Sequence, residues 1–233
     1  MARRAMAVLT LGILAVLPAA ARASSLELRI GGFFPRADSN LFRDDSDLYT
    51  VTKSDWKGVY GGAEFSFTPA DHVELGFSLD GYGRTVDTNY RDYTRADGRE
   101  IFQSLRLTLV PLGATLRLFP ADRYATISPY VGVGPDLVFY KYEEFGDFID
   151  FQSPGPGLDI LSDHFRSDGA RPGFHVTGGL RVRVGHDFSI LGEGRYQWAK
   201  ATLGDDFRAQ PGQDALRLDL SGWSAVVGLS IRF

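Results

Sequence analysis

The sequence has no cysteine and no apolar run long enough for a membrane-spanning helix. Without cysteine the chain cannot form disulfides, so an exported form has to be stable without cross-links. The apolar run from Ala5 to Leu17 falls short of the roughly 20 residues that a spanning helix needs, and no later segment reaches that length. We therefore expect no helical membrane anchor.

Positive charge is also scarce. The chain carries 25 Lys and Arg against 29 Asp and Glu. Three arginines, Arg3, Arg4 and Arg22, lie near the N-terminus, so residues 24–233 keep 22 positive against 29 negative side chains, a balance of −7. Because nucleic acid binding draws on concentrated Lys and Arg, we expect no nucleic acid partner.

The N-terminus has the pattern of a secretory signal. Arg3 and Arg4 precede the apolar run, and small residues then lead to Ala21-Arg22-Ala23, a small-x-small cleavage site. We predict a signal peptide over residues 1–23. The remaining 24–233 can build one sizeable domain but hardly two.

The chain is instead rich in alternation with a period of two. From Trp223 to Phe233 every second side chain is apolar and the others are mostly small or polar, which is typical of a strand with one buried or lipid-facing side. The pattern recurs along the chain, and we predict eight strands, at 26–34, 57–68, 73–84, 103–119, 127–142, 174–185, 189–200 and 216–233.

The connections between these strands alternate in length. Long polar segments at 35–56, 85–102, 143–173 and 201–215 are separated by three short turns. Outer-membrane barrels have long external loops and short periplasmic turns. We predict an all-β fold, an eight-stranded antiparallel up-and-down transmembrane β-barrel. The apolar positions change parity at Pro111, where we expect a β-bulge, and again near Ser221-Gly222.

Alternation leaves open which face points inward, and a soluble periplasmic binding barrel would have an apolar interior. Charges of both signs on the polar face favour a polar interior, where they can pair. Aromatic residues at strand ends favour membrane boundaries. The predicted interior charges are Glu27, Arg29, Glu64, Glu74, Asp80, Arg106, Arg117, Asp136, Arg181, Arg183, Glu193 and Arg195. The predicted aromatic belts are Phe67, Phe119, Phe188 and Phe233 on the periplasmic side, and Phe34, Trp56, Phe102, Tyr142, Phe174 and Trp198 on the outer side.

Two stretches resemble one known family. Residues 107–119 hold Pro-Leu before the inner half of a strand, and 127–134 hold Pro-Tyr-Val-Gly-x-Gly. This hairpin is similar to that of the OmpW-like outer-membrane β-barrel proteins. The resemblance implies outer-membrane lipid and lipopolysaccharide as surroundings. It also implies insertion by the barrel assembly machinery, with Phe233 as the assembly signal. It implies no single activity, because members act as porin-like channels, adhesins, immune-evasion factors or enzymes.

Candidate chemistry is sparse, and we predict no catalytic residue, metal or cofactor. His164 or His175 with an aspartate could serve an outer-membrane enzyme acting on lipid A or peptides, but no spacing supports it. Acidic residues at 44–47 and 143–150 could hold calcium, although solvated loop carboxylates explain them more simply. We therefore expect a non-enzymatic barrel with a surface, binding or structural role and limited small-molecule permeation, its external ligand unspecified.

Overall fold

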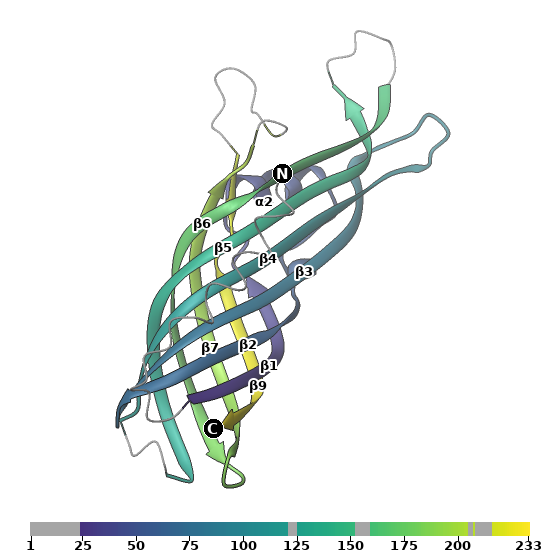
Figure 1. The fold of residues 1–233 in the computed structure, drawn as a ribbon. Helices are drawn as coiled ribbons and strands as arrows, with labels where there is room; N and C mark the ends of the chain where they lie inside the picture. The colour runs from purple at the N-terminus through teal and green to yellow at the C-terminus, as the bar shows by residue number, and fades with distance from the viewer. Residues whose placement is uncertain (1–23, 121–124, 152–158, 205–206, 208–215) are drawn as a thin grey trace.

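The computed structural model describes residues 24–120, 125–151, 159–204, 207 and 216–233, so the predicted signal peptide lies outside the described residues. Long antiparallel strands form a tilted barrel (Figure 1). Eight strands of the described chain make its wall: β1 (Ser24–Pro35), β2 (Gly58–Ala70), β3 (Val73–Thr94), β4 (Glu100–Leu118), β5 (Ile127–Asp150), β6 (Asp159–Arg183), β7 (Phe188–Thr202) and β9 (Gly222–Arg232).

The wall closes on itself. Each strand pairs with its neighbours in chain order, and β9 pairs with both β7 and β1. The first and last strands meet in an unbroken ladder from Ser25↔Arg232 to Pro35↔Gly222. Closure satisfies every strand edge, which a lipid environment requires because lipid cannot hydrogen-bond exposed backbone. The predicted eight-stranded up-and-down barrel is confirmed.

Two of the predicted long loops are mostly strand. β3 continues to Thr94 and β4 starts at Glu100, so little of 85–102 is loop, and β5 and β6 pair as far as Asp150↔Asp159. The prediction was wrong because the apolar alternation fades beyond the lipid-facing band. The backbone ladder continues without it, since strand pairing does not need an apolar face.

The first predicted loop, 35–56, is also partly ordered into helix. It contains α2 (Asn40–Leu48), which buries Leu41, Phe42 and Asp45, and the 3₁₀ helix η2 (Lys53–Trp56). A helix of nine residues offers only two turns, too few for its apolar spacing to stand out in a polar stretch. No helix among the described residues is long and apolar enough to cross a membrane.

The outer surface of the wall is apolar. Every wall strand contributes exposed apolar side chains, and Ile30, Val59 and Val227 are more than 60% exposed. A contiguous apolar surface of this kind is costly in water and is suited to lipid. This argues against the alternative of a soluble periplasmic barrel, whose apolar side chains would point inward.

The predicted bulge at Pro111 is absent. The pairing of β4 keeps one register on both sides of this residue, with Leu79↔Leu112 and Tyr82↔Leu109 toward β3 and Pro111↔Val138 toward β5. The same holds near the end of the chain. The short strand β8 (Arg217–Asp219) and β9 share a single register against β7, from Thr202↔Arg217 to Phe188↔Ile231.

Continuous register means that the side chains do not change sides. Leu105, Leu107 and Leu109 face inward like Thr115 and Arg117 farther along the same strand. What changes is the chemistry of the lumen, which is apolar in its outer half and charged in its inner half. The sequence pattern was misread as a parity switch because apolar residues were expected only on the lipid face.

Candidate functional site: the two layers of the lumen

The inner half of the lumen is filled by a network of acidic and basic side chains, which we call the ionic layer. All of its members are at most 5% exposed. They come from seven of the wall strands and meet across the lumen. The ionic layer consists of Glu27, Arg29, Glu64, Glu74, Asp80, Arg117, Asp136, His175, Arg181, Glu193 and Arg195.

Arg117 on β4 lies at the centre of the ionic layer. Its guanidinium contacts four carboxylates, from Glu27 (3.4 Å), Glu64 (3.1 Å), Glu74 (3.2 Å) and Glu193 (2.9 Å). Four wall strands are therefore tied to one cation. A buried guanidinium is stable only when its donors and charge are matched, and carboxylates from several sides meet that need.

Two further arginines extend the ionic layer to more of the wall. Arg29 on β1 makes a bidentate contact with Asp80, at 2.9 and 2.6 Å, and also reaches Glu193 on β7 at 3.3 Å. Arg181 on β6 binds Glu27 at 2.5 Å and Glu74 at 3.0 Å. These contacts join strands on different sides of the barrel, so the side chains fill the lumen at this level.

Two of the predicted interior charges lie elsewhere or are less enclosed. Arg106 was wrongly placed inside. It points outward from β4, its side chain is 46% exposed, and its guanidinium lies over the ring of Phe145 and 3.9 Å from Glu143. The error follows from the false parity switch at Pro111. Arg183, the last residue of β6, is half-buried.

His175 is held inside the ionic layer by polar neighbours. Its Nδ1 lies 3.0 Å from Asp136 and 3.1 Å from the guanidinium of Arg195, and its Nε2 lies 3.0 Å from the hydroxyl of Thr115. Sequence analysis predicted an inward His175 but not its link to Thr115. A hydroxyl, imidazole and carboxylate in this order resemble a hydrolase relay.

That relay has no access to a substrate. Thr115 is 3% exposed, His175 is fully buried, and Asp136 is also held by Arg195. The other histidine considered, His164, lies on the exposed extension of β6, 3.4 Å from Glu143. The structure therefore does not join the two histidines into one site, and it adds no support to the enzyme alternative.

Glycines make room for the ionic layer. A Cβ on Gly76 would lie 2.2 Å from Oε1 of Glu64, and one on Gly113 would lie 2.7 Å from Oδ1 of Asp136. Both glycines face the lumen beside residues of the ionic layer. Glycines are therefore required on the lumen face of these strands, because the charged side chains occupy the space that a larger residue would need.

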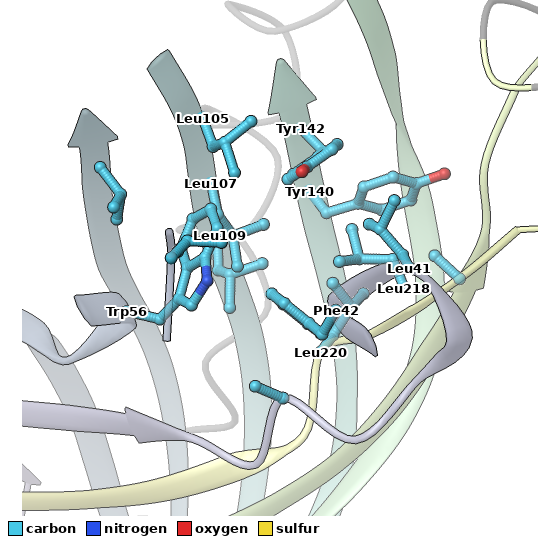
Figure 2. Close-up of a cluster of buried hydrophobic side chains, with 14 of the residues drawn as sticks. Leu41, Phe42, Trp56, Leu105, Leu107, Leu109, Tyr140, Tyr142, Leu218 and Leu220 are labelled. Atoms are coloured by element: carbon cyan, nitrogen blue, oxygen red, sulfur yellow. The ribbon is translucent and has the colours of Figure 1, made fainter. Parts of the chain in front are cut away.

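The outer half of the lumen is filled by the segment between β1 and β2. We call residues 36–57, which include α2 and η2, the plug. Figure 2 shows Leu41, Phe42 and Trp56 of the plug facing the apolar inner wall. The wall side of this cluster comes from β4, β5 and the segment before β9, and its labelled members are Leu105, Leu107, Leu109, Tyr140, Tyr142, Leu218 and Leu220.

The plug accounts for two errors in the predicted aromatic belts. Trp56 and Tyr142 are buried inside the barrel, where their rings lie 6.3 Å apart, and do not reach the lipid surface. A third belt residue, Phe119, is also wrong, because it is buried next to Tyr130. The belt residues that are exposed include Phe34, Phe102, Phe174, Phe188 and Phe233.

Polar contacts fix the plug at both ends. The hydroxyl of Tyr82 donates to the carbonyl of Trp56, and Arg84 Nε donates to the carbonyl of Asp55 at 2.7 Å. At the α2 end, Arg91 donates to the carbonyls of Ser46 and Tyr49 at 2.8 and 3.0 Å. The partners of the plug are therefore wall residues of β3 as well as the apolar cluster.

One buried carboxyl lies in the plug. Asp45 on α2 is 5% exposed and accepts a hydrogen bond from the hydroxyl of Tyr142 at 2.9 Å. Burial raises the pKa of Asp45 well above its usual range, and the nearby carboxylate of Glu144 raises this pKa further. The docked plug therefore favours the protonated, uncharged form of Asp45.

The acidic segments considered for calcium have protein partners. Asp147 pairs with Arg95 and accepts from Ser162 at 2.6 Å, while Glu143 binds Lys141 at 2.8 Å. No three His, Cys, Asp or Glu side chains of the described residues come together as metal ligands.

The β3–β4 and β5–β6 hairpins rise beyond the plug as one unit. The ion pair of Arg95 with Asp147 joins them, and the rings of Tyr93 and Phe151 meet at 5.3 Å. The backbone N–H of Ile149 also donates to the hydroxyl of Tyr90 at 3.1 Å. This raised wall of four strands is the part of the described chain that projects farthest from the barrel (Figure 1).

An eight-stranded ring with an apolar exterior and a charged, filled interior defines a small membrane β-barrel. Its structural neighbours are small outer-membrane β-barrel proteins. OprG from Pseudomonas aeruginosa is 11% identical, with 91% of this chain and 97% of that chain covered and a TM-score of 0.56. A major outer membrane protein from Thermus thermophilus is 11% identical, with 90% and 99% covered and a TM-score of 0.49.

Outer membrane protein W of E. coli is 16% identical, with 91% of this chain and 98% of that chain covered and a TM-score of 0.39. At these identities the likeness concerns the fold. No protein-family profile matches the sequence, and no curated protein matches it.

Proposed function

We propose that the protein is a closed barrel of the bacterial outer membrane that presents its raised hairpins for binding at the cell surface. The apolar exterior and the shared fold support the membrane setting. The observation that carries the proposal is the double closure of the lumen, by the ionic layer on the inner side and by the plug on the outer side.

This proposal replaces the permeation expected from the sequence. A passage for solutes needs a continuous polar path, whereas Arg117 and its four carboxylates occupy the lumen with at most 5% exposure. Moving these side chains aside would leave charges unpaired in a poorly solvated space. The fold thus supports a scaffold whose variable, projecting segments carry the function.

Two measurements test the proposal. Purified protein in planar lipid bilayers should give a closed record at moderate voltage, and steady conductance in most insertions would contradict the closed barrel. Fractionation of cells should recover the protein with outer membranes and release it only with detergent. Recovery in the soluble periplasm would contradict the membrane setting.

Insertion into that membrane requires a recognised strand. We infer that β9, together with Phe233 that follows it, serves as the signal for the barrel assembly machinery. In support, Phe233 is 71% exposed and its backbone pairs with Ser24 on β1, so this residue lies at the seam where the barrel closes.

A further inference from the structure

A cavity of about 270 Å³ lies at the outer end of the barrel, beside the plug. It is separate from the ionic layer and from the raised hairpins. The plug, β7 and β8 all contribute to it, and its lining residues are Asp38, Ser39, Asn40, Arg43, Lys200, Arg217, Leu218 and Asp219.

The cavity is framed by a fixed junction. Asn40 Oδ1 accepts hydrogen bonds from the backbone N–H of Arg217 at 2.7 Å and of Leu41 at 3.1 Å. This link holds the start of α2 against β8. The cavity is therefore built between two elements whose relative position is set by hydrogen bonds, which favours a preformed binding site.

The positive side chains of the cavity are only partly compensated by the protein, since Arg43 interacts electrostatically with Asp38 but makes no ion pair with it. Arg43, Lys200 and Arg217 line the cavity, and none forms an ion pair with another group in the described chain. Of the two lining carboxylates, Asp38 is paired with Arg36 at 2.7 Å. The lining thus has an excess of positive charge, and the N-terminal end of α2 adds to it because its first turn has no acidic residue.

One oxygen of the second lining carboxylate, Asp219, has no hydrogen-bond donor among the described residues. Asp219 is 1% exposed, and its Oδ1 accepts from the backbone N–H of Ser221 at 3.1 Å. Its Oδ2 accepts no hydrogen bond from the described residues and lies 4.0 Å from Nε of Arg36. A buried oxygen without a donor is costly, so a donor on a ligand would be favoured there.

We propose that this cavity binds a small polyhydroxy carboxylate. The carboxylate is held by Arg43, Lys200 and Arg217, and a ligand hydroxyl donates to Oδ2 of Asp219. The excess positive charge favours a net anion over a zwitterion, and the unfilled acceptor distinguishes a hydroxy acid from a simple carboxylate. The cavity volume suits a molecule of sugar-acid size.

Calorimetry on the folded full chain in detergent, at low salt, tests the proposal with D-gluconate as probe. Acetate presents the charge without hydroxyls, and sorbitol presents hydroxyls without charge. We expect gluconate to bind at least about tenfold more tightly than either, since each charge-assisted hydrogen bond changes affinity by that order. Gluconate binding no tighter than acetate, or absent, would overturn the proposal.

Variants locate the site. The double variant R43Q/K200Q should weaken gluconate at least about tenfold. R99Q, which removes an exposed arginine from the β3–β4 tip, should leave it unchanged. D219N should weaken gluconate but not acetate. Equal binding by R43Q/K200Q and the wild type would place the site elsewhere, and L-serine or inorganic phosphate binding more tightly than gluconate would contradict the ligand class. Heat-modifiable migration confirms that each variant is folded.

Discussion

The two halves of the lumen are closed by different means. In the ionic layer, side chains of the wall strands pair with each other, so closure cannot be separated from the barrel itself. In the outer half a segment of loop is inserted, and it packs through Leu41, Phe42 and Trp56. The inner closure is thus part of the wall, whereas the outer one is a docked segment of the chain between β1 and β2. Variants that affect one closure and spare the other test this difference.

The largest effect is expected for Arg117→Met. It leaves four buried carboxylates without their shared cation, which should lower the free energy of unfolding by about 5 kcal/mol. Urea unfolding in lipid vesicles, followed by tryptophan fluorescence, measures it. The control is Arg106→Met, which removes an outward arginine from the same strand and should change stability little. An equal decrease in the free energy of unfolding in the two variants would mean that the ionic layer contributes no more to stability than an exposed arginine does.

Trp56→Ala should affect only the plug. Loss of this buried ring is expected to weaken plug docking by about 3–4 kcal/mol, because the cavity left in the cluster cannot collapse fully. Trypsin should then cleave the folded barrel within the plug, at Arg43 or Lys53, while the barrel keeps its heat-modifiable migration. Trp223→Ala, on the lipid face, is the control and should leave the plug protected. Unfolding of the whole barrel by Trp56→Ala would show that the two closures are coupled.

A smaller effect is expected from pH, through Asp45. Since the docked state raises its pKa, docking is fully favourable near or below the ordinary value of about 4 and weakens as pH rises toward the raised value. The loss is at most about 1.4 kcal/mol per pH unit for this one proton.

Trypsin cleavage of the plug as a function of pH measures this dependence. Asp45→Asn cannot ionise and should reduce the pH dependence of cleavage over this range. The exposed neighbour Asp44 provides the control, because Asp44→Asn should keep the wild-type dependence. A wild-type plug that is equally protected at every pH would contradict the role assigned to Asp45.

The smallest effect on stability is expected for Phe233→Ala, which lies outside both layers. Removing an exposed ring should change the free energy of unfolding by no more than about 0.5 kcal/mol. The amount of folded barrel in the membrane should nevertheless fall several-fold, because the assembly signal is weakened. Normal levels of heat-modifiable protein in this variant would contradict that inference.

Sequence patterns predicted the wall well and the outer lumen poorly. Strand number, order and closure follow from period-two alternation, which reports a face that is uniformly apolar. Leu105 and Leu218 do not fit this pattern, because they are apolar and point into the lumen. Their partners belong to the plug, which is distant in sequence and too short to show a helical period. Nothing local in the chain could therefore distinguish a lumen-facing leucine from a lipid-facing one.

The ionic layer was easier to predict from the sequence, because charged residues repeated along one face of a strand have few structural explanations. Glu64, Glu74 and Arg181 were placed inside from alternation together with the mixed charges on the polar face, and the structure brings them together. Their partners were not predictable, since contacts such as Arg117 with Glu193 depend on how the barrel curves. Arg106 shows the limit of this kind of prediction. The wrong assumption of a parity switch at Pro111 placed its side chain in the lumen, whereas it points outward.

The place of the plug in the chain sets an order of events during assembly. It precedes β2, yet its apolar contacts lie on β4, β5 and the segment before β9, so its binding surface is complete only once the last strand has joined the first. Before that point, the apolar cluster that buries Leu41 and Phe42 is incomplete. Docking of the plug is therefore expected to be a late step of folding, after the wall strands that carry its contacts have paired.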